Sequence, residues 1–224
     1  MSPKLIGKNT MSQSKPIYIL SDKKVENTIS LPMIEISYIP QNIDYTQYEA
    51  LIFTSKNAIK SINSFSNSWK KVPAFVIAPQ TAKTLESLGG NLHYVGKNGH
   101  GNDFAKEIDA KLCGKKVLYV CGKKVVSNLF AILNDSGVLC DKIVVYETLC
   151  KKYDEKISLP KDSIVIFSSP STLECFFKNI VSWDESYTDI SIGKTTAKYF
   201  PQNITPIIPN DTTLEACVKL SLEL

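Results

Sequence analysis

The chain of 224 residues contains no arginine, and all 26 of its basic residues are lysine. Nucleic-acid-binding domains usually gather basic residues on one face and use arginine for bidentate contacts. Here the net charge is only +4, and the lysines occur singly or in pairs. We therefore expect no nucleic-acid partner. An anionic ligand would have to be bound by lysines, hydroxyl groups and backbone N–H groups.

Long apolar runs are also missing from the sequence. No stretch approaches the ~18 uncharged apolar residues that a membrane-spanning helix needs. No apolar core of signal-peptide length precedes Lys15. We therefore expect a cytoplasmic protein without a membrane partner. Residues 1–15 are expected to be an extension that is disordered or introduced by cloning.

Motifs for metals, disulfides and nucleotides are absent too. The six cysteines show no C-x-x-C spacing and are interpreted as reduced thiols. The two histidines, His93 and His100, have no cluster of carboxylates or cysteines nearby, so we expect neither a metal site nor a histidine-based catalytic triad. The sequence contains no P-loop and no Gly-x-Gly-x-x-Gly, which disfavours nucleotide binding.

What the sequence does contain is a regular alternation of short apolar runs and amphipathic segments. Strands are predicted at 17–20, 33–39, 50–53, 74–77, 92–95, 117–120, 142–146, 163–167, 190–192 and 204–208. Helices are predicted at 57–64, 81–88, 103–112, 124–134, 171–180, 195–200 and 213–222. This alternation favours an α/β fold, in which helices cover both faces of parallel sheets.

Internal similarity indicates two related domains. LIFTSKNAIKSI (51–62) resembles VIFSSPSTLECF (165–176), and VIAPQTAKTL (76–85) resembles SIGKTTAKYF (191–200). The two offsets are 165 − 51 = 114 and 191 − 76 = 115 residues. Ten strands suit two sheets of about five better than one sheet.

A third similarity, between IYILSDKKV (17–25) and VLYVCGKKV (117–125), has a different offset of 117 − 17 = 100 residues. The similar segments therefore predict interrupted connectivity rather than a simple tandem repeat. We expect domain one to combine 16–37 with 150–224, and domain two to span 41–145. The segments 37–41 and 143–150 are expected to be the two linker strands between the domains. The predicted architecture is thus two similar domains with parallel five-stranded sheets, a two-stranded linker, and a ligand cleft between the domains.

Hydroxyl-bearing residues follow the predicted strands at matching places in both halves. In parallel sheets, ligands bind beyond the carboxyl ends of the strands, where helix N-termini favour anions. The candidates are Thr54, Ser55, Asn57 and Thr81 in one half, and Ser168, Ser169, Ser171, Thr195 and Thr196 in the other. Each of them can equally be an ordinary helix cap, worth ~1 kcal/mol. Their repetition favours a site for a polyanion.

Tyr146 is the candidate proton donor. It lies in VVYET, where the chain is expected to pass between the domains. A tyrosine phenol has a pKa near ~10 and can donate a proton. The alternative is a half-buried strand tyrosine without a chemical role. Lys123 and Lys124 follow a strand end, and they are either anion contacts or solvated surface lysines.

The sequence resembles uroporphyrinogen-III synthases from about Ile17 to Leu222. The segments that carry the resemblance are FTSKNAI (53–59), IAPQTAKTL (77–85), VYET (145–148), FSSPSTL (167–173), IGKTTAKYF (192–200) and TTLEACV (212–218). The chain has Ser21-Asp22 and Cys121-Gly122 at two places where the family often has an arginine.

The resemblance implies a monomeric enzyme of tetrapyrrole and heme biosynthesis that needs no metal or organic cofactor. Its substrate would be hydroxymethylbilane, a linear tetrapyrrole with eight carboxylates, handed over by hydroxymethylbilane synthase. It would lose water and close to uroporphyrinogen III, with ring D inverted through a spiro intermediate. By motif match, Tyr146 would assist loss of the hydroxyl. The hydroxyl-bearing residues named above, together with Gly193, would bind the substrate.

Two other functions remain open. One is a non-catalytic two-domain module that binds a tetrapyrrole or another small polyanion in the same cleft. The other is an α/β enzyme acting on a nucleotide or sugar phosphate, which the missing phosphate loop disfavours.

Overall fold

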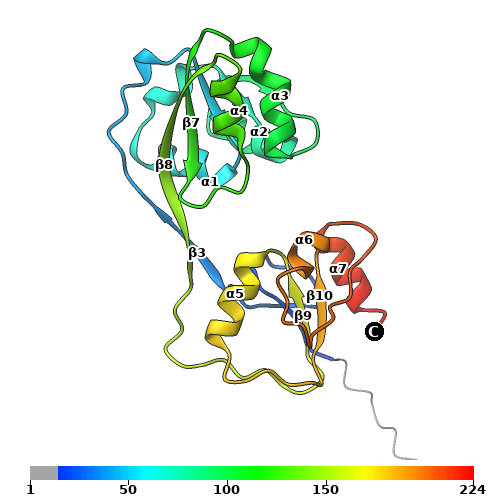
Figure 1. Cartoon of the computed structure of the whole chain (residues 1–224). Coiled ribbons are helices and arrows are strands. Elements are labelled where there is room, and N and C mark those ends of the chain that lie inside the picture. Colours follow the sequence, from blue (N-terminus) through cyan, green and yellow to red (C-terminus); the bar gives the residue numbers. More distant parts are fainter. Residues whose placement is uncertain (1–14) are drawn as a thin grey trace, which may run out of the picture. The chain divides into compact units, whose positions relative to one another are not determined.

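The computed structural model describes residues 15–224. Residues 1–14 of the predicted extension lie outside the described residues. The chain forms two compact units. Unit 1 combines the chain up to Glu35 with Cys150–Leu224, and unit 2 is Ile36–Leu149. Figure 1 follows the chain through both of them.

Unit 2 is built around a six-stranded sheet with the order β3-β8-β7-β4-β5-β6. The strands are β3 (Ile34–Tyr38), β8 (Leu139–Cys150), β7 (Lys116–Gly122), β4 (Ala50–Phe53), β5 (Ala74–Val76) and β6 (Leu92–Val95). The pairings from β8 across to β6 are parallel. All residues of β4 and β5 are buried, as expected for strands covered on both faces.

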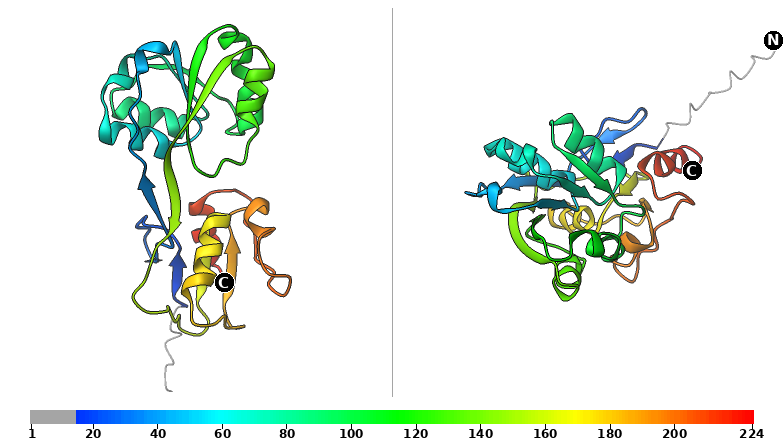
Figure 2. Two further views of the ribbon diagram at one scale, coloured as in Figure 1. Left: turned by 60° about the vertical axis from the view of Figure 1, so that its left-hand side comes forward. Right: turned by 90° about the horizontal axis from the view of Figure 1, so that it is seen from above.

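Helices cover both faces of this sheet, which Figures 1 and 2 show from three directions. Helices α1 (Lys56–Phe65) and α2 (Pro79–Ser87) pack on one face, where Ile59, Ile62 and Leu85 meet Leu51 and Phe53. The short 3₁₀ turns at Tyr45–Gln47 and Ser68–Lys71 lie on the same side. Helices α3 (Gly101–Leu112) and α4 (Leu129–Asp135) pack on the other face.

Unit 1 contains a four-stranded parallel sheet with the order β10-β9-β1-β2. Its strands are β10 (Thr188–Ser191), β9 (Ile164–Phe167), β1 (Ile17–Ile19) and β2 (Ile29–Ser30). Helix α5 (Pro170–Asn179) packs on one face and α7 (Leu214–Ser221) on the other. The single-turn helix α6 (Lys194–Ala197) follows β10.

The prediction of an α/β fold with helix-flanked sheets is confirmed, whereas the prediction of two five-stranded sheets is wrong. Segment 204–208 makes only one bridge, between Ile207 and Ile190, and β2 was not predicted. The strand predicted at 33–39 is found as β3, which lies next to β8 in the six-stranded sheet. The sheets therefore have four and six strands.

The helix predicted at 124–134 begins only at Leu129. The preceding residues form a loop after β7, and the backbone N–H of Asn128 donates to Asn102 Oδ1 at 2.8 Å. Val125 and Val126 lie in this loop, and β-branched residues are weak helix formers. Val125, Val126 and Ser127 of this loop line the pocket described below.

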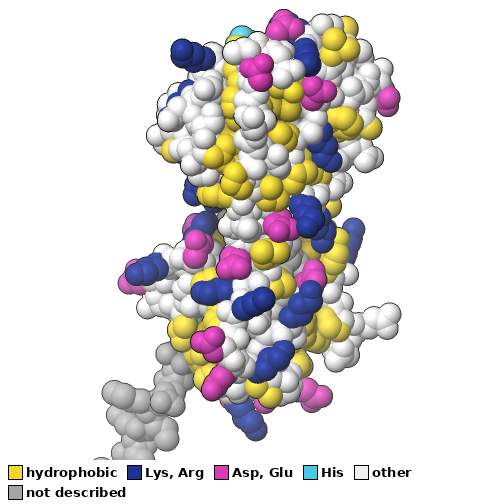
Figure 3. All heavy atoms as spheres, turned by 90° about the vertical axis from the view of Figure 1, so that its left-hand side faces the viewer, with side chains coloured by type: hydrophobic (Ala, Val, Ile, Leu, Met, Phe, Trp, Pro, Cys, Tyr) yellow, Lys and Arg dark blue, Asp and Glu magenta, His cyan; other side chains and the backbone are white. Residues whose placement is uncertain are grey.

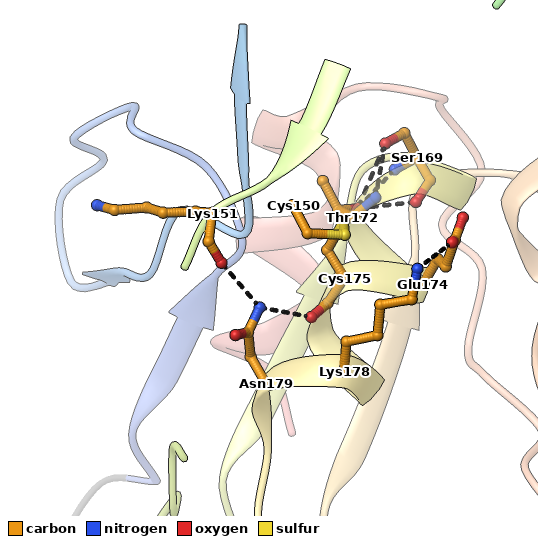
Figure 4. The surroundings of a disulfide bond; sticks show 8 residues. All are labelled: Cys150, Lys151, Ser169, Thr172, Glu174, Cys175, Lys178 and Asn179. Atoms are coloured by element: carbon orange, nitrogen blue, oxygen red, sulfur yellow. Dashed lines mark hydrogen bonds and ion pairs between the residues drawn. A yellow bond between two sulfur atoms is a disulfide. The ribbon is translucent and has the colours of Figure 1, made fainter. Parts of the chain in front are cut away.

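The prediction that all six cysteines are reduced is wrong for two of them. Cys150 and Cys175 form a disulfide between the end of β8 and α5, shown in Figure 4. The Asn179 amide donates to the carbonyls of Lys151 and Cys175 next to it, at 3.1 and 2.8 Å. The other four cysteines are free thiols, of which only Cys113 is exposed. The partners are 25 residues apart, so no local motif announces the pair.

Charges of both signs occur together on one face of the molecule. On the face drawn in Figure 3, lysines alternate with aspartates and glutamates, and no area is covered by one sign alone. None of the helices within residues 15–224 is long and apolar enough to cross a membrane.

Candidate functional site

The carboxyl ends of β4 and β7 in unit 2 border a pocket of about 250 Å³. Parallel strands end at the same edge of a sheet, so the residues that follow them come together there. The pocket is lined by Thr54, Ser55, Ile77, Gly99, Gly101, Tyr119, Gly122, Lys124, Val125, Val126, Ser127 and Tyr146. Three predicted site residues, Thr54, Ser55 and Tyr146, therefore share one pocket.

Tyr146 enters the pocket from β8, opposite Gly122 of β7. The strand register shifts at this point, and such a bulge re-aims the side chains around it. A Cβ atom on Gly122 would lie 2.6 Å from Tyr146 Cζ, so the phenol occupies space that only glycine leaves free. The Lys123 backbone N–H donates to the Tyr146 carbonyl at 2.9 Å, and Ser61 donates to the Val145 carbonyl.

The Tyr146 phenol is held in its protonated form. Burial raises its pKa, the Ser55 side chain partly offsets this by hydrogen bonding, and the nearby Cys121 thiol raises it further. Burial also raises the pKa of Cys121 to about 11, so this thiol is an inert neighbour rather than a nucleophile. Tyr146 can therefore act as a proton donor at neutral pH.

A second phenol lies deeper in the same pocket. Tyr119 of β7 is fully buried, and its hydroxyl lies 2.9 Å from Thr54 Oγ1. Desolvation raises the pKa of Tyr119 to about 12, although hydrogen bonding with the Thr54 and Ser127 side chains acts in the opposite direction. The pocket thus combines two phenols with three aliphatic hydroxyls and the Lys124 ammonium.

Ser55 and Asn57 allow the two interpretations of these candidates, helix cap and ligand contact, to be compared. Ser55 is the N-cap of α1 and accepts a hydrogen bond from the Asn57 backbone N–H at 3.2 Å. It also lines the pocket beside Tyr146, whereas Asn57 lies outside the lining. Ser55 is therefore a helix cap that also faces the pocket.

The matching residues of unit 1 gather at the start of α5. Ser169 is its N-cap: Ser169 Oγ accepts from the Thr172 backbone N–H at 3.2 Å, and Thr172 Oγ1 accepts from the Ser169 N–H at 3.1 Å, as Figure 4 shows. Ser168 and Ser171 flank this capping box and are half-buried. Ser169 is thus placed as a helix cap. Within residues 15–224, no hydrogen bond of the Ser168 or Ser171 side chain is found.

The remaining predicted residues lie in varied surroundings. Thr81 is buried inside the first turn of α2, and Thr196 is buried in α6. Thr195 is exposed beside it. Gly193 precedes α6, and a Cβ atom there would lie 2.8 Å from Thr212 Cγ2. Thr81 and Thr196 are thus placed as core threonines, and Thr195 as the accessible one.

Sequence patterns did not indicate Tyr119 or Ser127 as site residues. They left Lys124 open between an anion contact and a solvated surface lysine, and it lines the pocket. Tyr119 sits in the apolar run VLYV, where an aromatic residue suggests core packing. Ser127 lies within the predicted helix at 124–134, which hid the loop. Within residues 15–224, no group of three or more His, Cys, Asp or Glu side chains is placed to hold a metal ion.

Comparisons with known proteins identify the family and the fold of the chain. The family model for uroporphyrinogen-III synthase HemD matches residues 22–219. The fold is similar to a crystal structure of uroporphyrinogen-III synthetase from Helicobacter pylori, with a TM-score of 0.80 and 32% identity over 93% of this chain and 99% of that chain.

A second similar structure is a mutant uroporphyrinogen III synthase from Thermus thermophilus. Its TM-score is 0.53 at 11% identity, covering 93% of this chain and 99% of that one, which supports the fold alone. Comparison with curated protein sequences found no match. The family match and the fold together show that this chain belongs to the uroporphyrinogen-III synthase family.

Proposed function

We propose that this chain converts hydroxymethylbilane to uroporphyrinogen III, by loss of water and ring closure with inversion of ring D. The observation that carries the proposal is the pocket of unit 2, where a protonated Tyr146 phenol lies among the hydroxyls of Thr54, Ser55 and Ser127. Membership of the family supplies the substrate class.

In the proposed reaction, Tyr146 is the general acid. The bond between the terminal hydroxymethyl carbon and its oxygen breaks, the phenol proton goes to the departing oxygen, and water leaves. This leaves an azafulvenium cation and a Tyr146 phenolate. The substituted carbon of ring D attacks the cation and gives the spiro intermediate. Rearrangement to isomer III then releases the α-hydrogen of ring D as a proton, which restores the phenol. Burial raises the pKa of Tyr146, so the phenol is protonated at neutral pH but is a weak general acid. A weak acid suffices in the proposal because the azafulvenium cation forms readily.

Most of the proposed catalysis is positioning of a flexible substrate. The pocket of about 250 Å³ is smaller than the ~300–1,000 Å³ typical of sites that enclose a whole ligand. We propose that the pocket accommodates one pyrrole ring with its carboxylate arms. Lys124 and the hydroxyls of Thr54, Ser55 and Ser127 bind these carboxylates. Val126, which is 94% exposed at this pocket, offers an apolar contact for a ring face.

Other carboxylates of the same substrate are assigned to unit 1. Ser168, Ser169 and Ser171 with the N-terminus of α5, and Gly193 and Thr195 before and in α6, are the proposed partners. We also propose that the protein is a cytoplasmic monomer that takes its substrate from hydroxymethylbilane synthase and needs no added cofactor.

The decisive test is the isomer formed. Hydroxymethylbilane is generated in situ, the protein is added, and the oxidised products are separated by chromatography. Uncatalysed closure gives isomer I, so an excess of isomer III supports the proposed function. Isomer I alone from folded protein would refute it and favour a non-catalytic tetrapyrrole-binding module, which equilibrium binding of the product would then test.

Replacement of Tyr146 tests the general acid. Tyr146→Phe keeps the ring and its packing but removes the proton, so isomer III formation should slow by roughly one to three orders of magnitude. The matched control is Tyr45→Phe, because Tyr45 is equally a buried phenol of unit 2 and its hydroxyl has no hydrogen-bond partner among residues 15–224. An unchanged rate in Tyr146→Phe would remove Tyr146 from the mechanism.

A further inference from the structure

The starting observation is a buried hydroxyl with one hydrogen-bond partner at the pocket. Tyr119 OH lies 2.9 Å from Thr54 Oγ1. Tyr119 itself is fully buried, whereas Thr54 and Ser127 are half-buried and line the pocket. The phenol is therefore bonded to Thr54, one of two hydroxyls that face the ligand space.

These two hydroxyls come from separate elements. Thr54 directly follows β4, and Ser127 belongs to the loop after β7. The loop is fixed on α3: Asn128 N–H donates to Asn102 Oδ1 at 2.8 Å, and a Cβ atom on Gly101 would lie 2.5 Å from Ser127 Oγ. Ser127 thus rests directly against a glycine backbone. Of the two hydroxyls, Thr54 is the one bonded to Tyr119.

Proton counting gives this pair of hydroxyls a direction. The two groups carry two protons, and the link between them uses one. A phenol proton left unused would be buried without an acceptor, which is costly, so Tyr119 donates to Thr54 Oγ1. The Thr54 proton then remains available and can be donated into the pocket.

We propose that Tyr119 is a positioning residue of the reaction, because its phenol sets the direction in which the Thr54 hydroxyl donates into the pocket beside Tyr146. The inference rests on the proposed function. One oriented O–H next to the general acid holds a substrate oxygen so that the reacting end of the bilane meets Tyr146. Tyr119 itself contacts no reacting atom and acts through Thr54.

The experiment compares Tyr119→Phe, Thr54→Val, Thr54→Ser and the double variant Tyr119→Phe/Thr54→Val in the isomer assay. Tyr119→Phe should lower kcat for isomer III roughly tenfold, because one oriented hydrogen bond is lost, while KM changes less than about twofold. Thr54→Ser keeps the hydroxyl and should retain most of the turnover that Thr54→Val loses. The double variant should be no slower than the slower single variant, since both remove the same link.

Tyr45→Phe is the control for removing a buried phenol hydroxyl from unit 2, and its kcat should match the wild type. Thermal melts of every variant separate lost structure from lost positioning. Should Tyr119→Phe fail to fold, the comparison of Thr54→Val with Thr54→Ser decides, and equal loss in both overturns the inference.

The outcomes also separate this inference from the proposed function. A wild-type chain that yields only isomer I refutes the function and the inference with it. Wild-type formation of isomer III, together with wild-type kcat in Tyr119→Phe or with fully additive losses in the double variant, overturns the inference alone.

Discussion

At the residue scale, Asp189 is the carboxyl group whose surroundings suit it least. It lies in β10 with 6% of its surface exposed, and its Oδ1 has no hydrogen-bond partner among residues 15–224. Burial raises its pKa to about 7, well above the value of 3.8 for a free aspartate. The folded protein therefore keeps Asp189 neutral at mildly acidic pH, where the unfolded chain has already ionised it.

This difference predicts how stability depends on pH. Stability from a neutral Asp189 is fully present below about pH 4 and is lost as the pH rises to about 7, at up to ~1.4 kcal/mol per pH unit. Asp189→Asn should therefore stabilise the protein at pH 8, by up to ~4 kcal/mol, and change little near pH 4. Urea denaturation at both pH values measures this.

The matched control for Asp189 is Asp211→Asn, which removes an exposed carboxylate of the same unit. It should leave the free energy of unfolding unchanged within ~0.5 kcal/mol at both pH values. Equal stability of Asp189→Asn and the wild type at pH 8 would mean that a water molecule or a rearrangement satisfies the buried carboxylate.

Single residues also show what sequence patterns can and cannot predict. Tyr146 was predicted as a site residue because VVYET lies where the chain leaves one half, and the structure places it in a pocket with Thr54 and Ser55. Tyr119 was missed because its side chain meets Thr54 only through the parallel pairing of β4 with β7. A side-chain contact between residues that are 65 positions apart in the sequence leaves no local signal.

At the element scale, the start of α5 tests whether a cap is also a ligand site. Ser169→Ala removes the capping hydroxyl and should cost ~1 kcal/mol of stability. Ser169→Asp keeps a good cap and favours the helix dipole, so stability should be retained. Its negative charge should nevertheless raise KM for hydroxymethylbilane severalfold if α5 binds a carboxylate.

Thr213 provides the control for this comparison, since it caps α7 by accepting from the Ala216 backbone N–H at 3.1 Å. Thr213→Ala should cost a similar free energy of unfolding, and Thr213→Asp should leave KM unchanged. An unchanged KM in Ser169→Asp as well would reduce Ser169 to a structural cap.

The disulfide between the end of β8 and α5 gives a second prediction at this scale. A cross-link that closes 25 residues restricts the unfolded chain and stabilises by about 3 kcal/mol in the loop-entropy model. Cys150→Ser/Cys175→Ser should therefore melt several degrees below the wild type, and dithiothreitol should lower the melting temperature of the wild type but not of this variant. Cys113→Ser, at an exposed free thiol, is the control. A wild type insensitive to dithiothreitol would contradict a stabilising role.

Most helices and strands were predictable because they depend on local patterns. The helix predicted at 213–222 is found as α7, and the strands at 50–53 and 92–95 have the predicted bounds. Sheet composition was not predictable in the same way. Segment 204–208 has a strand-like sequence but only one bridge, and β2 is two residues long with both side chains exposed. Edge pairings depend on neighbours that are distant in sequence.

At the scale of the whole molecule, the two units repeat one design on the same physical basis. Each places a buried parallel strand before a capped helix, β4 before α1 and β9 before α5. The internal similarity of 51–62 and 165–176 reflects this repetition. Duplicated strand ends give hydroxyls and helix N-termini twice, which suits a ligand with many carboxylates better than one with a single charge.

Binding without arginine should make affinity depend on salt. All 26 basic residues are lysines, whose ammonium groups act as hydrated point charges rather than bidentate forks. If Lys124 and the helix ends bind carboxylates, the affinity for uroporphyrinogen III should fall at least tenfold between about 20 mM and about 500 mM NaCl. Anaerobic calorimetric titration measures it. Lys124→Ala should weaken binding at low salt and flatten this dependence, whereas Lys106→Ala, at an exposed position of α3 outside the pocket lining, should do neither. The same affinity at both salt concentrations would show that neutral hydrogen bonds, not charge, hold the ligand.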